Sequence, residues 1–214
     1  GLIYCHSIEQ YVRQILELDL TFAPFEYQES EKRHYTSFPL SSGERVYFGG
    51  IIDRVDKVGS RLRVVDYKTG SEETRMAEWD LLLDSKYKAI LQTLIYCAFL
   101  AESGVPKDEI YPAIYMLRGD YGLMVKGKGY DPLVQLPLDT YGDTSDSAEL
   151  PASPTLAQSP LVSEGNSPKG SGAKSPKKQK ELQTTLLSYA EAEASFREVF
   201  IHGVLDELYD ASTP

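Results

Sequence analysis

The stretch GGIIDRVDKVGSRLRVVDYKTG, residues 49–70, constrains the fold of the chain more than any other segment. Two runs rich in valine, isoleucine and leucine flank Gly59 and Ser60, a pair typical of a two-residue β-turn. The stretch therefore predicts an antiparallel hairpin. In the register that this turn sets, Asp53 lies opposite Asp66, where a half-buried sheet normally carries apolar side chains.

The predicted hairpin gathers three charged side chains on one face. Because side chains alternate along a strand, Lys68 shares a face with the two aspartates, while Asp56 and Arg63 form a predicted cross-strand ion pair on the other face. Opposed like charges destabilise a sheet by up to about 1 kcal/mol per pair unless something compensates them. A hard divalent cation, Mg²⁺ or Mn²⁺, would compensate, since such ions are held by one or two carboxylates together with phosphate oxygens.

Lys68 extends this hypothesis towards a reaction. Its ammonium group could orient or deprotonate a water, or offset the negative charge that builds on a phosphate in the transition state, so the cluster suits phosphodiester hydrolysis. The alternative is a solvated charge cluster on an uncovered sheet face, and spacing alone supports the two interpretations equally. The apolar side chains expected on the same face argue against exposure: Ile51, Val55, Leu62 and Val64.

Periodicity in the rest of the chain predicts an α/β core. Apolar residues at helical spacing between Ile8 and Leu18 predict an opening helix of about three turns that packs on the core. Strands are expected at 33–40, 44–56, 60–68 and 109–118, the last at a sheet edge or with a bulge because it contains Pro112. Helices are expected at 86–104, with Gly104 as the C-cap, and at 186–210. We therefore predict a central mixed β-sheet flanked by helices.

Composition divides the chain into three expected parts. Its 214 residues suffice for one domain with a proper core and an appendage. From 141 to 183 the mix of Ser, Pro, Gly, Ala and Thr cannot bury enough apolar surface to offset chain entropy. We expect a core with its N-terminal helix at 1–140, a flexible low-complexity insertion at 141–183, and a C-terminal helix at 184–214 that packs back on the core. The lysine-rich run SPKGSGAKSPKKQK is better explained as part of a solvated loop than as a phosphate-binding track.

Charge and cysteine content exclude several classes of function. A net charge of −10 argues against a generic basic surface for nucleic acid, so any such contact is expected to be local. Cys5 and Cys97 lie far apart without a CxxC motif, which indicates buried core residues and not a metal site or disulfide scaffold. No run of about 18 apolar residues and no signal-peptide pattern occurs, so we expect a cytoplasmic protein without membrane contact.

Three motifs, in this order, resemble the core signature of the PD-(D/E)XK nuclease superfamily in its RecB/AddB-type branch. They are GGIIDRVD at 49–56, VVDYKTG at 64–70 and LQTLIYC at 91–97. The resemblance covers about residues 24–104, and the stretch at 196–210 is similar to the helix near the end of such domains. It implies a restriction-endonuclease-like α/β core.

The resemblance also implies roles for residues of the hairpin. Asp53 and Asp66 become ligands of Mg²⁺ or Mn²⁺, and the main-chain carbonyl of Tyr67 becomes a third ligand. Lys68 becomes the catalytic lysine. In such domains an acidic residue upstream often completes the site. The stretch YQESEKRHY offers Glu29 and Glu31, of which Glu31 fits the usual distance better.

The third motif places two polar residues on the helix that follows. Gln92 and Tyr96 are four residues apart and share a helix face, and the resemblance makes them the pair that steadies the site and the nucleic-acid strand. Without the hairpin, Gln92 would be better explained as a residue that caps a polar gap, and Tyr96 as a core residue. Relatives often supply a histidine ligand from an upstream helix, but His6, His34 and His202 are each better explained as structural residues.

The implied activity is that of a metal-dependent deoxyribonuclease. The resemblance favours an exonuclease domain that acts on DNA in recombination and repair beside a helicase. The chain has no GxxxxGK[ST] motif, so we expect the helicase to be another domain or subunit and the chain to be a domain of a larger protein. The alternative is a catalytically degenerate module of the same fold that binds DNA or a partner without cutting. Catalysis is favoured because Asp53, Asp66 and Lys68 are all chemically competent.

Overall fold

The protein is described by a computed structural model that covers residues 2–70, 72–117, 124–125, 128–129, 132–138 and 184–209. The elements in chain order are α1 (Leu2–Phe22), β1 (Glu26–Pro39), β2 (Arg45–Val58), β3 (Arg61–Lys68), η1 (Trp79–Leu83), η2 (Ser85–Tyr87), α2 (Lys88–Glu102), η3 (Lys107–Glu109), β4 (Ile110–Met116), β5 (Met124–Val125), β6 (Lys128–Gly129), β7 (Gln135–Pro137), β8 (Thr184–Leu186), α3 (Tyr189–Arg197), the π-helix η4 (Glu198–Leu205) and α4 (Asp206–Leu208). The predicted insertion at 141–183 lies outside the described residues.

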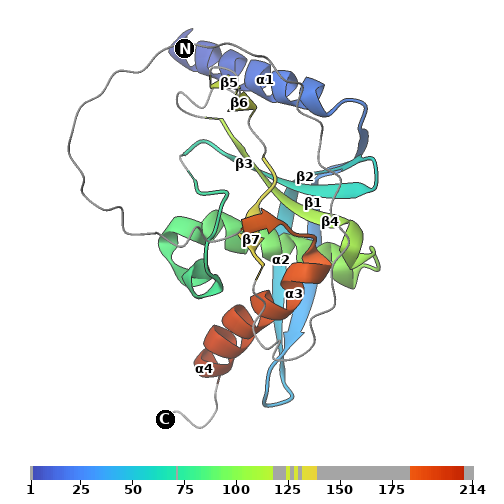
Figure 1. Cartoon of the computed structure of the whole chain (residues 1–214), viewed down its shortest axis with the longest axis vertical. Helices are drawn as coiled ribbons and strands as arrows, with labels where there is room; N and C mark the ends of the chain where they lie inside the picture. The colour runs from blue at the N-terminus through green and yellow to red at the C-terminus, as the bar shows by residue number, and fades with distance from the viewer. Residues whose placement is uncertain are drawn as a thin grey trace, which may run out of the picture. The chain divides into compact units, whose positions relative to one another are not determined.

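A four-stranded sheet of order β1-β2-β3-β4 forms the centre of the fold. The β1/β2 and β2/β3 pairs are antiparallel, whereas β3 and β4 are parallel and are connected through α2. Helix α1 lies on one side of the sheet, and α2 and α3 lie on the other (Figure 1). This arrangement confirms the predicted mixed sheet flanked by helices. Strand β4 lies at the edge of this sheet, as Pro112 predicts, because proline cannot donate to a second ladder.

The hairpin has the predicted register. Asp56 pairs with Arg63 and Val55 pairs with Val64. The turn between the strands contains Gly59 with φ +61°, a left-handed conformation that glycine adopts without steric cost and that two-residue hairpin turns require.

Strands β1 and β2 extend well beyond β3. Each has 14 residues, but β3 pairs with β2 over 54–58 only. The remaining part, residues 32–39 of β1 with 45–52 of β2, is a two-stranded stretch that we call the ribbon. Strand β1 begins at Glu26, well before the predicted start at residue 33. Its polar sequence shows no alternation, but pairing with β2 satisfies its backbone groups and holds it extended.

Two apolar cores lie on opposite faces of the sheet. The larger one joins the sheet to α2, α3 and η4, and includes the buried side chain of Cys97, as predicted. Where it meets the ribbon, four aromatic rings pack against one another: Phe38, Phe48, Phe196 and Phe200. The smaller core joins the sheet to α1 and contains Leu18, Val65, Ala113, Tyr115 and Leu133. Among the described residues, no helix is long and apolar enough to cross a membrane.

Helix α1 is longer than predicted, and only part of its apolar stripe packs on the sheet. It has 21 residues, and of its apolar stripe Leu18 is buried against the sheet. The helix packs on the core as predicted, through Leu18 and Phe22, but Ile8, Val12 and Leu16 of the stripe are 60%, 49% and 58% exposed. The reason is that a charged contact, Asp19 to Arg54, fixes which side of the helix meets the sheet.

The ends of two helices follow from local chemistry. Gly104, at φ +96°, ends α2, and its N–H donates to the Ala101 carbonyl, as the predicted C-cap requires. At the start of α3, the Glu191 carboxylate accepts hydrogen bonds from the backbone N–H and the hydroxyl of Ser188. These caps fix where α2 and α3 stop and start against the sheet.

Candidate active site

Strands β2 and β3 separate at the level of the two predicted aspartates. The last pair of their ladder is Arg54 with Val65. One position further, Oδ2 of Asp53 accepts a 2.8 Å hydrogen bond from the backbone N–H of Tyr67. The sequence predicts that Asp53 lies opposite Asp66, and the register brings the two residues to the same level. There the strands are joined by the side chain of Asp53 and not by a hydrogen bond between backbone groups. The two carboxylates therefore stand where the strands diverge.

A chain of polar contacts runs from β3 to α2. The Lys68 ammonium lies 2.6 Å from Oδ2 of Asp66 and donates a 2.9 Å hydrogen bond to Oε1 of Gln92. The Gln92 amide in turn donates to the hydroxyl oxygen of Tyr96 at 2.7 Å. The predicted residues Asp66, Lys68, Gln92 and Tyr96 are thus brought into one connected group.

The Asp66 carboxylate is held in an environment that disfavours its charge. The pKa of Asp66 is raised from its ordinary 3.8 to about 6, chiefly by burial and to a lesser extent by the negative charges of Asp53 and Glu72, against the opposing effect of Lys68. Although Lys68 lies close, the buried Oδ2 of Asp66 accepts no hydrogen bond of good geometry. A divalent cation would further stabilise the charged form of this carboxylate, which burial disfavours and Lys68 offsets in part.

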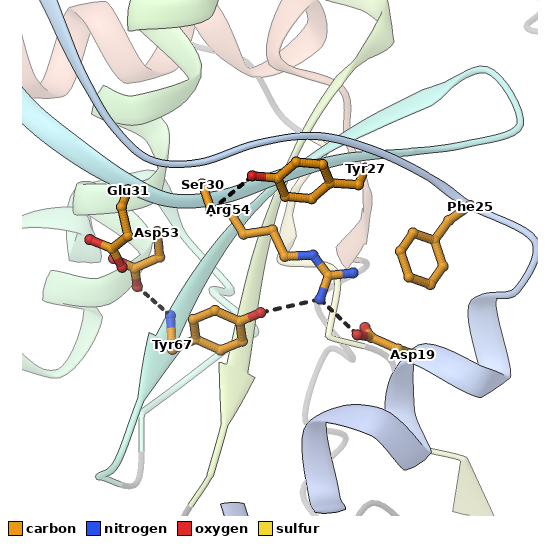
Figure 2. A pocket seen from close by; sticks show the side chains of 8 residues that line it. All are labelled: Asp19, Phe25, Tyr27, Ser30, Glu31, Asp53, Arg54 and Tyr67. Carbon is orange, nitrogen blue, oxygen red and sulfur yellow. Dashed lines mark hydrogen bonds and ion pairs between the residues drawn. The ribbon is translucent and has the colours of Figure 1, made fainter. Parts of the chain in front are cut away.

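Glu31 stands next to this pair of strands. Figure 2 shows its carboxylate beside that of Asp53. Its backbone has φ +50°, which is unique among the non-glycine residues that the structure describes. This left-handed conformation costs an L-residue about 1 kcal/mol, and such strain gathers at functional sites.

The inward-facing alternation of both strands reverses at the level of Glu31 and Asp53. In β2 the side chains of Ile52 and Val55, three positions apart, are buried in the same core. The reversal at this point gives Asp53 its place at the boundary between the two faces. Apolar periodicity could not reveal this reversal, which lies close to a shift in the β1/β2 register between Tyr27 and Glu29.

The alternative acidic residue, Glu29, is engaged elsewhere. Its carboxylate lies 2.6 Å from Nζ of Lys32 and 2.6 Å from Nε2 of His34, and it lines a different pocket. His34 also stacks on the ring of Phe99. Glu29 and His34 therefore form a local pair away from the Asp53 carboxylate.

The opposite face of the hairpin carries a buried ionic network. The Arg63 guanidinium donates to both oxygens of Asp56 at 2.6 and 2.8 Å, which confirms the predicted ion pair. Arg54 donates to Asp19 at 2.7 Å and to the Tyr67 hydroxyl at 3.2 Å, so α1 is tied to the strands that carry the site (Figure 2). Each buried charge has a partner, as buried charges require.

One acidic residue near the site escaped sequence reasoning. Glu72 acts electrostatically on Asp66, and its side chain, 12% exposed, lies 3.7 Å from Nζ of Lys88. It follows the third strand by four positions, in SEE, a context that resembles an ordinary polar loop. Its proximity to Asp66 depends on how the loop folds back, which periodicity does not predict.

The residues present fit a hard divalent cation with few protein ligands. Within the described part of the chain, no three His, Cys, Asp or Glu side chains converge into a ready-made metal cage. Mg²⁺, however, is usually held by one or two carboxylates and completes its shell with water and substrate phosphates. The carboxylate oxygens of Asp53 and Asp66 match that chemistry.

Comparisons with known proteins identify the family of the chain. A family model of the PD-(D/E)XK nuclease superfamily matches residues 3–210, which confirms the resemblance seen in the motifs. The chain is similar to a subunit of the ATP-dependent helicase/deoxyribonuclease of Clostridium tetani, with 36% identity over 83 residues that cover 36% of this chain and 7% of that relative. It is also similar to the corresponding subunit of the enzyme of the same name from Acetivibrio thermocellus, with 33% identity over 102 residues that cover 44% of this chain and 8% of that relative. The chain thus spans a small part of these relatives, and no solved structure gives a significant match.

Proposed function

The chain belongs to the PD-(D/E)XK nuclease superfamily, and we propose that it is a Mg²⁺- or Mn²⁺-dependent deoxyribonuclease domain that hydrolyses phosphodiester bonds. The main support is the position of Lys68, whose ammonium contacts Asp66 on its own strand and Gln92 on α2. Members of this superfamily generally use divalent metal ions. The two relatives are named as subunits of a helicase/deoxyribonuclease, which favours DNA as the substrate of this chain.

We assign the metal ligands to the point where β2 and β3 separate. Asp53, Asp66 and the main-chain carbonyl of Tyr67 would hold the ion, and Glu31 would add a fourth oxygen ligand from β1. When bound, the cation supplies Lewis-acid polarisation of the phosphodiester and lowers the pKa of a nearby water. The hydrogen bond from the Tyr67 N–H to Asp53 keeps that carboxylate in place before any ligand arrives.

Lys68 supplies the positive charge that the reaction needs beside these carboxylates. Its ammonium has three N–H donors, of which two face Asp66 and Gln92. The remaining donor can bind the scissile phosphate and stabilise the charge that develops on it. The hydrogen bond to Gln92 fixes the position of the Lys68 ammonium, so the side chain needs little reorganisation when the substrate binds.

Tyr96 extends the contact surface towards the DNA strand. Its hydroxyl oxygen accepts from Gln92, which leaves the hydroxyl hydrogen available to donate to a phosphate of the bound strand. Tyr96 is therefore a DNA-positioning residue in this proposal. It does not touch the reacting atoms.

The larger setting follows from the relatives' names. Both are named as subunits of an ATP-dependent helicase/deoxyribonuclease, so we propose that this domain acts as an exonuclease beside a helicase domain or subunit, in DNA recombination and repair in the cytoplasm. Such a partner would deliver strands to the site in an unpaired form.

A direct test compares cleavage and metal binding in the same samples. End-labelled single- and double-stranded DNA is incubated with the chain and Mn²⁺ or Mg²⁺, and Mn²⁺ binding is measured by calorimetry. Asp66→Asn should abolish cleavage and weaken Mn²⁺ binding, whereas Asp108→Asn, at an exposed position of η3, should change neither. DNA binding without any cleavage by the unmutated chain would favour the degenerate binding module instead.

A further inference from the structure

One face of the ribbon is open and unusually aromatic. Its inner face packs on the aromatic rings of the larger core, whereas on the outer face Tyr35 and Tyr47 are 68% and 78% exposed. Ile51, 40% exposed, and the exposed Arg33 and Arg45 occupy alternate positions of the same face. We call these five residues the ribbon face.

Tyr35 is arranged as a flat platform. Its cross-strand partner is Gly49, and a Cβ at that glycine would lie 2.8 Å from Cδ1 and 2.9 Å from Cε1 of the Tyr35 ring. The ring therefore lies against the glycine backbone, and its other side is open to solvent. A ring held in this way can stack a planar group with little loss of side-chain freedom.

Tyr47 provides a second aromatic side chain next to the first. It pairs with Ser37, so it is the diagonal neighbour of Tyr35 on the same face. Diagonal neighbours in an antiparallel pair lie about 7–8 Å apart, within reach of aromatic side chains. The two rings can therefore accept two nearby planar groups of one ligand.

The charges of the ribbon favour an anionic ligand. From Lys32 to Tyr47 the chain carries Lys32, Arg33 and Arg45 against Glu44, within a protein of net charge −10. Arg33 makes no ion pair with a carboxylate of the described residues. Arg45 is held along the ribbon by hydrogen bonds to the hydroxyl and carbonyl of Ser37, at 2.9 and 2.8 Å. Its charge is fixed beside the aromatic rings without being neutralised.

The ribbon face leads to the candidate site. Along β2, Arg45, Tyr47, Gly49 and Ile51 lead to Asp53, where the alternation reverses, and along β1 Arg33 leads to Glu31. A strand rises about 3.4 Å per residue, so Arg45 and Asp53 are separated by about 27 Å. A linear ligand lying on this face would have one end beside the carboxylates of Asp53 and Glu31.

We propose that the ribbon face binds single-stranded DNA and guides it to the site. Exposed aromatic rings with interspersed cations are the combination that binds single strands, since the rings stack on bases and the cations follow the phosphates. A duplex keeps its bases stacked internally and offers these rings no free base. The inference rests on the proposed nuclease function and adds to it the surface along which the strand reaches the site.

Binding without metal tests the ribbon face separately from catalysis. The affinity of the chain for a fluorescent oligothymidylate is measured by anisotropy in EDTA at low salt. Tyr35→Ala and Tyr47→Ala should each weaken binding about fivefold or more, whereas Tyr35→Phe and Tyr47→Phe, which keep the rings, should bind as the unmutated chain does. Leu20→Ala, an exposed apolar residue of α1, is the control for loss of exposed surface.

Charge is tested by the salt dependence of the same binding. Arg33→Gln should lower the slope of log affinity against log salt by about 0.7, the value expected for one phosphate contact with a single strand. Arg13→Gln, an exposed arginine of α1, should leave the slope unchanged. A duplex of the same length should be much less sensitive to Tyr35→Ala than the single strand.

The outcomes separate the two proposals. If the alanine variants bind and cut single strands as the unmutated chain does, or if the unmutated chain binds no single strand, the ribbon face is not a DNA track. The same holds if Tyr47→Ala abolishes only a self-association detected by sedimentation. If single strands bind through the tyrosines but are never cut with Mn²⁺, the ribbon face stands and the catalytic proposal fails.

Discussion

The Lys68 ammonium donates a 2.9 Å hydrogen bond to Oε1 of Gln92 and so joins the end of β3 to the middle of α2. Loss of this acceptor should release the ammonium without removing its charge. Hydrogen bonds to charged groups contribute about 1.5–3 kcal/mol, so Gln92→Leu should lower the cleavage rate about 10- to 100-fold. Single-turnover cleavage of labelled DNA with saturating Mn²⁺ measures this.

Two further measurements on Gln92→Leu distinguish a loss of Lys68 positioning from a general loss of structure. Mn²⁺ affinity and the melting temperature should stay near those of the unmutated chain, because Gln92 is half-buried and holds no ion in the proposal. Tyr96→Phe removes only the hydroxyl that accepts a hydrogen bond from Gln92, and it should have a smaller effect on the cleavage rate. An unchanged rate in Gln92→Leu would show that the contact does not position Lys68.

Asp66 should destabilise the metal-free fold at neutral pH. Its pKa is about 6 in the folded protein, above its ordinary value of 3.8, so between these values the folded state binds more protons than the unfolded state. The free energy of unfolding then falls as pH rises through this window. Above it, Asp66→Asn should be more stable than the unmutated chain by about 3 kcal/mol, and below about pH 4 the difference should vanish.

Denaturant unfolding in EDTA from pH 3.5 to 7.5 measures this difference. Asp56→Asn is the matched control, because it leaves Arg63 buried without its carboxylate partner and should destabilise the protein by several kcal/mol. Addition of Mn²⁺ should stabilise the unmutated chain but not Asp66→Asn. Equal stability of Asp66→Asn and the unmutated chain at pH 7 would contradict the assigned environment of Asp66.

The sequence predicted the central part of the site because that part depends on local rules. Turn chemistry at Gly59 set the register of β2 and β3, and alternation then placed Lys68 with Asp66 and Asp56 with Arg63. Helical spacing placed Gln92 and Tyr96 on one face. These relations involve neighbouring strands or a single helix turn, where periodicity determines contact.

The features that the sequence did not predict depend on irregular backbone and on tertiary contacts. Glu31 has a left-handed backbone within a polar segment, and the reversal of alternation lies close to a register shift between Tyr27 and Glu29. The approach of Glu72 to Asp66 follows from the path of a loop. The exposed stripe of α1 results from the buried contact of Asp19 with Arg54, which overrides the apolar pattern of the helix. Each is a tertiary effect that no local pattern encodes.

Glu31 should show opposite effects on stability and activity. Glycine adopts φ +50° without steric cost, so Glu31→Gly should raise the free energy of unfolding in EDTA by about 1 kcal/mol. The same change removes a proposed metal ligand and should weaken Mn²⁺ binding and slow cleavage. Glu31→Ala should weaken Mn²⁺ binding equally but give no gain in stability. A loss of stability in Glu31→Gly would show that the conformation is not strained.

The central claim is that Lys68 acts in the transition state of phosphodiester hydrolysis, and it is tested by single-turnover cleavage with Lys68→Met at saturating Mn²⁺. A lost transition-state contact should lower the cleavage rate about 100-fold or more, while Mn²⁺ affinity and DNA affinity stay within a few-fold. Lys107→Met, which removes a lysine paired with Glu193 on α3, should cut at the normal rate. If Lys68→Met cleaves DNA as fast as the unmutated chain, the account of this site is contradicted.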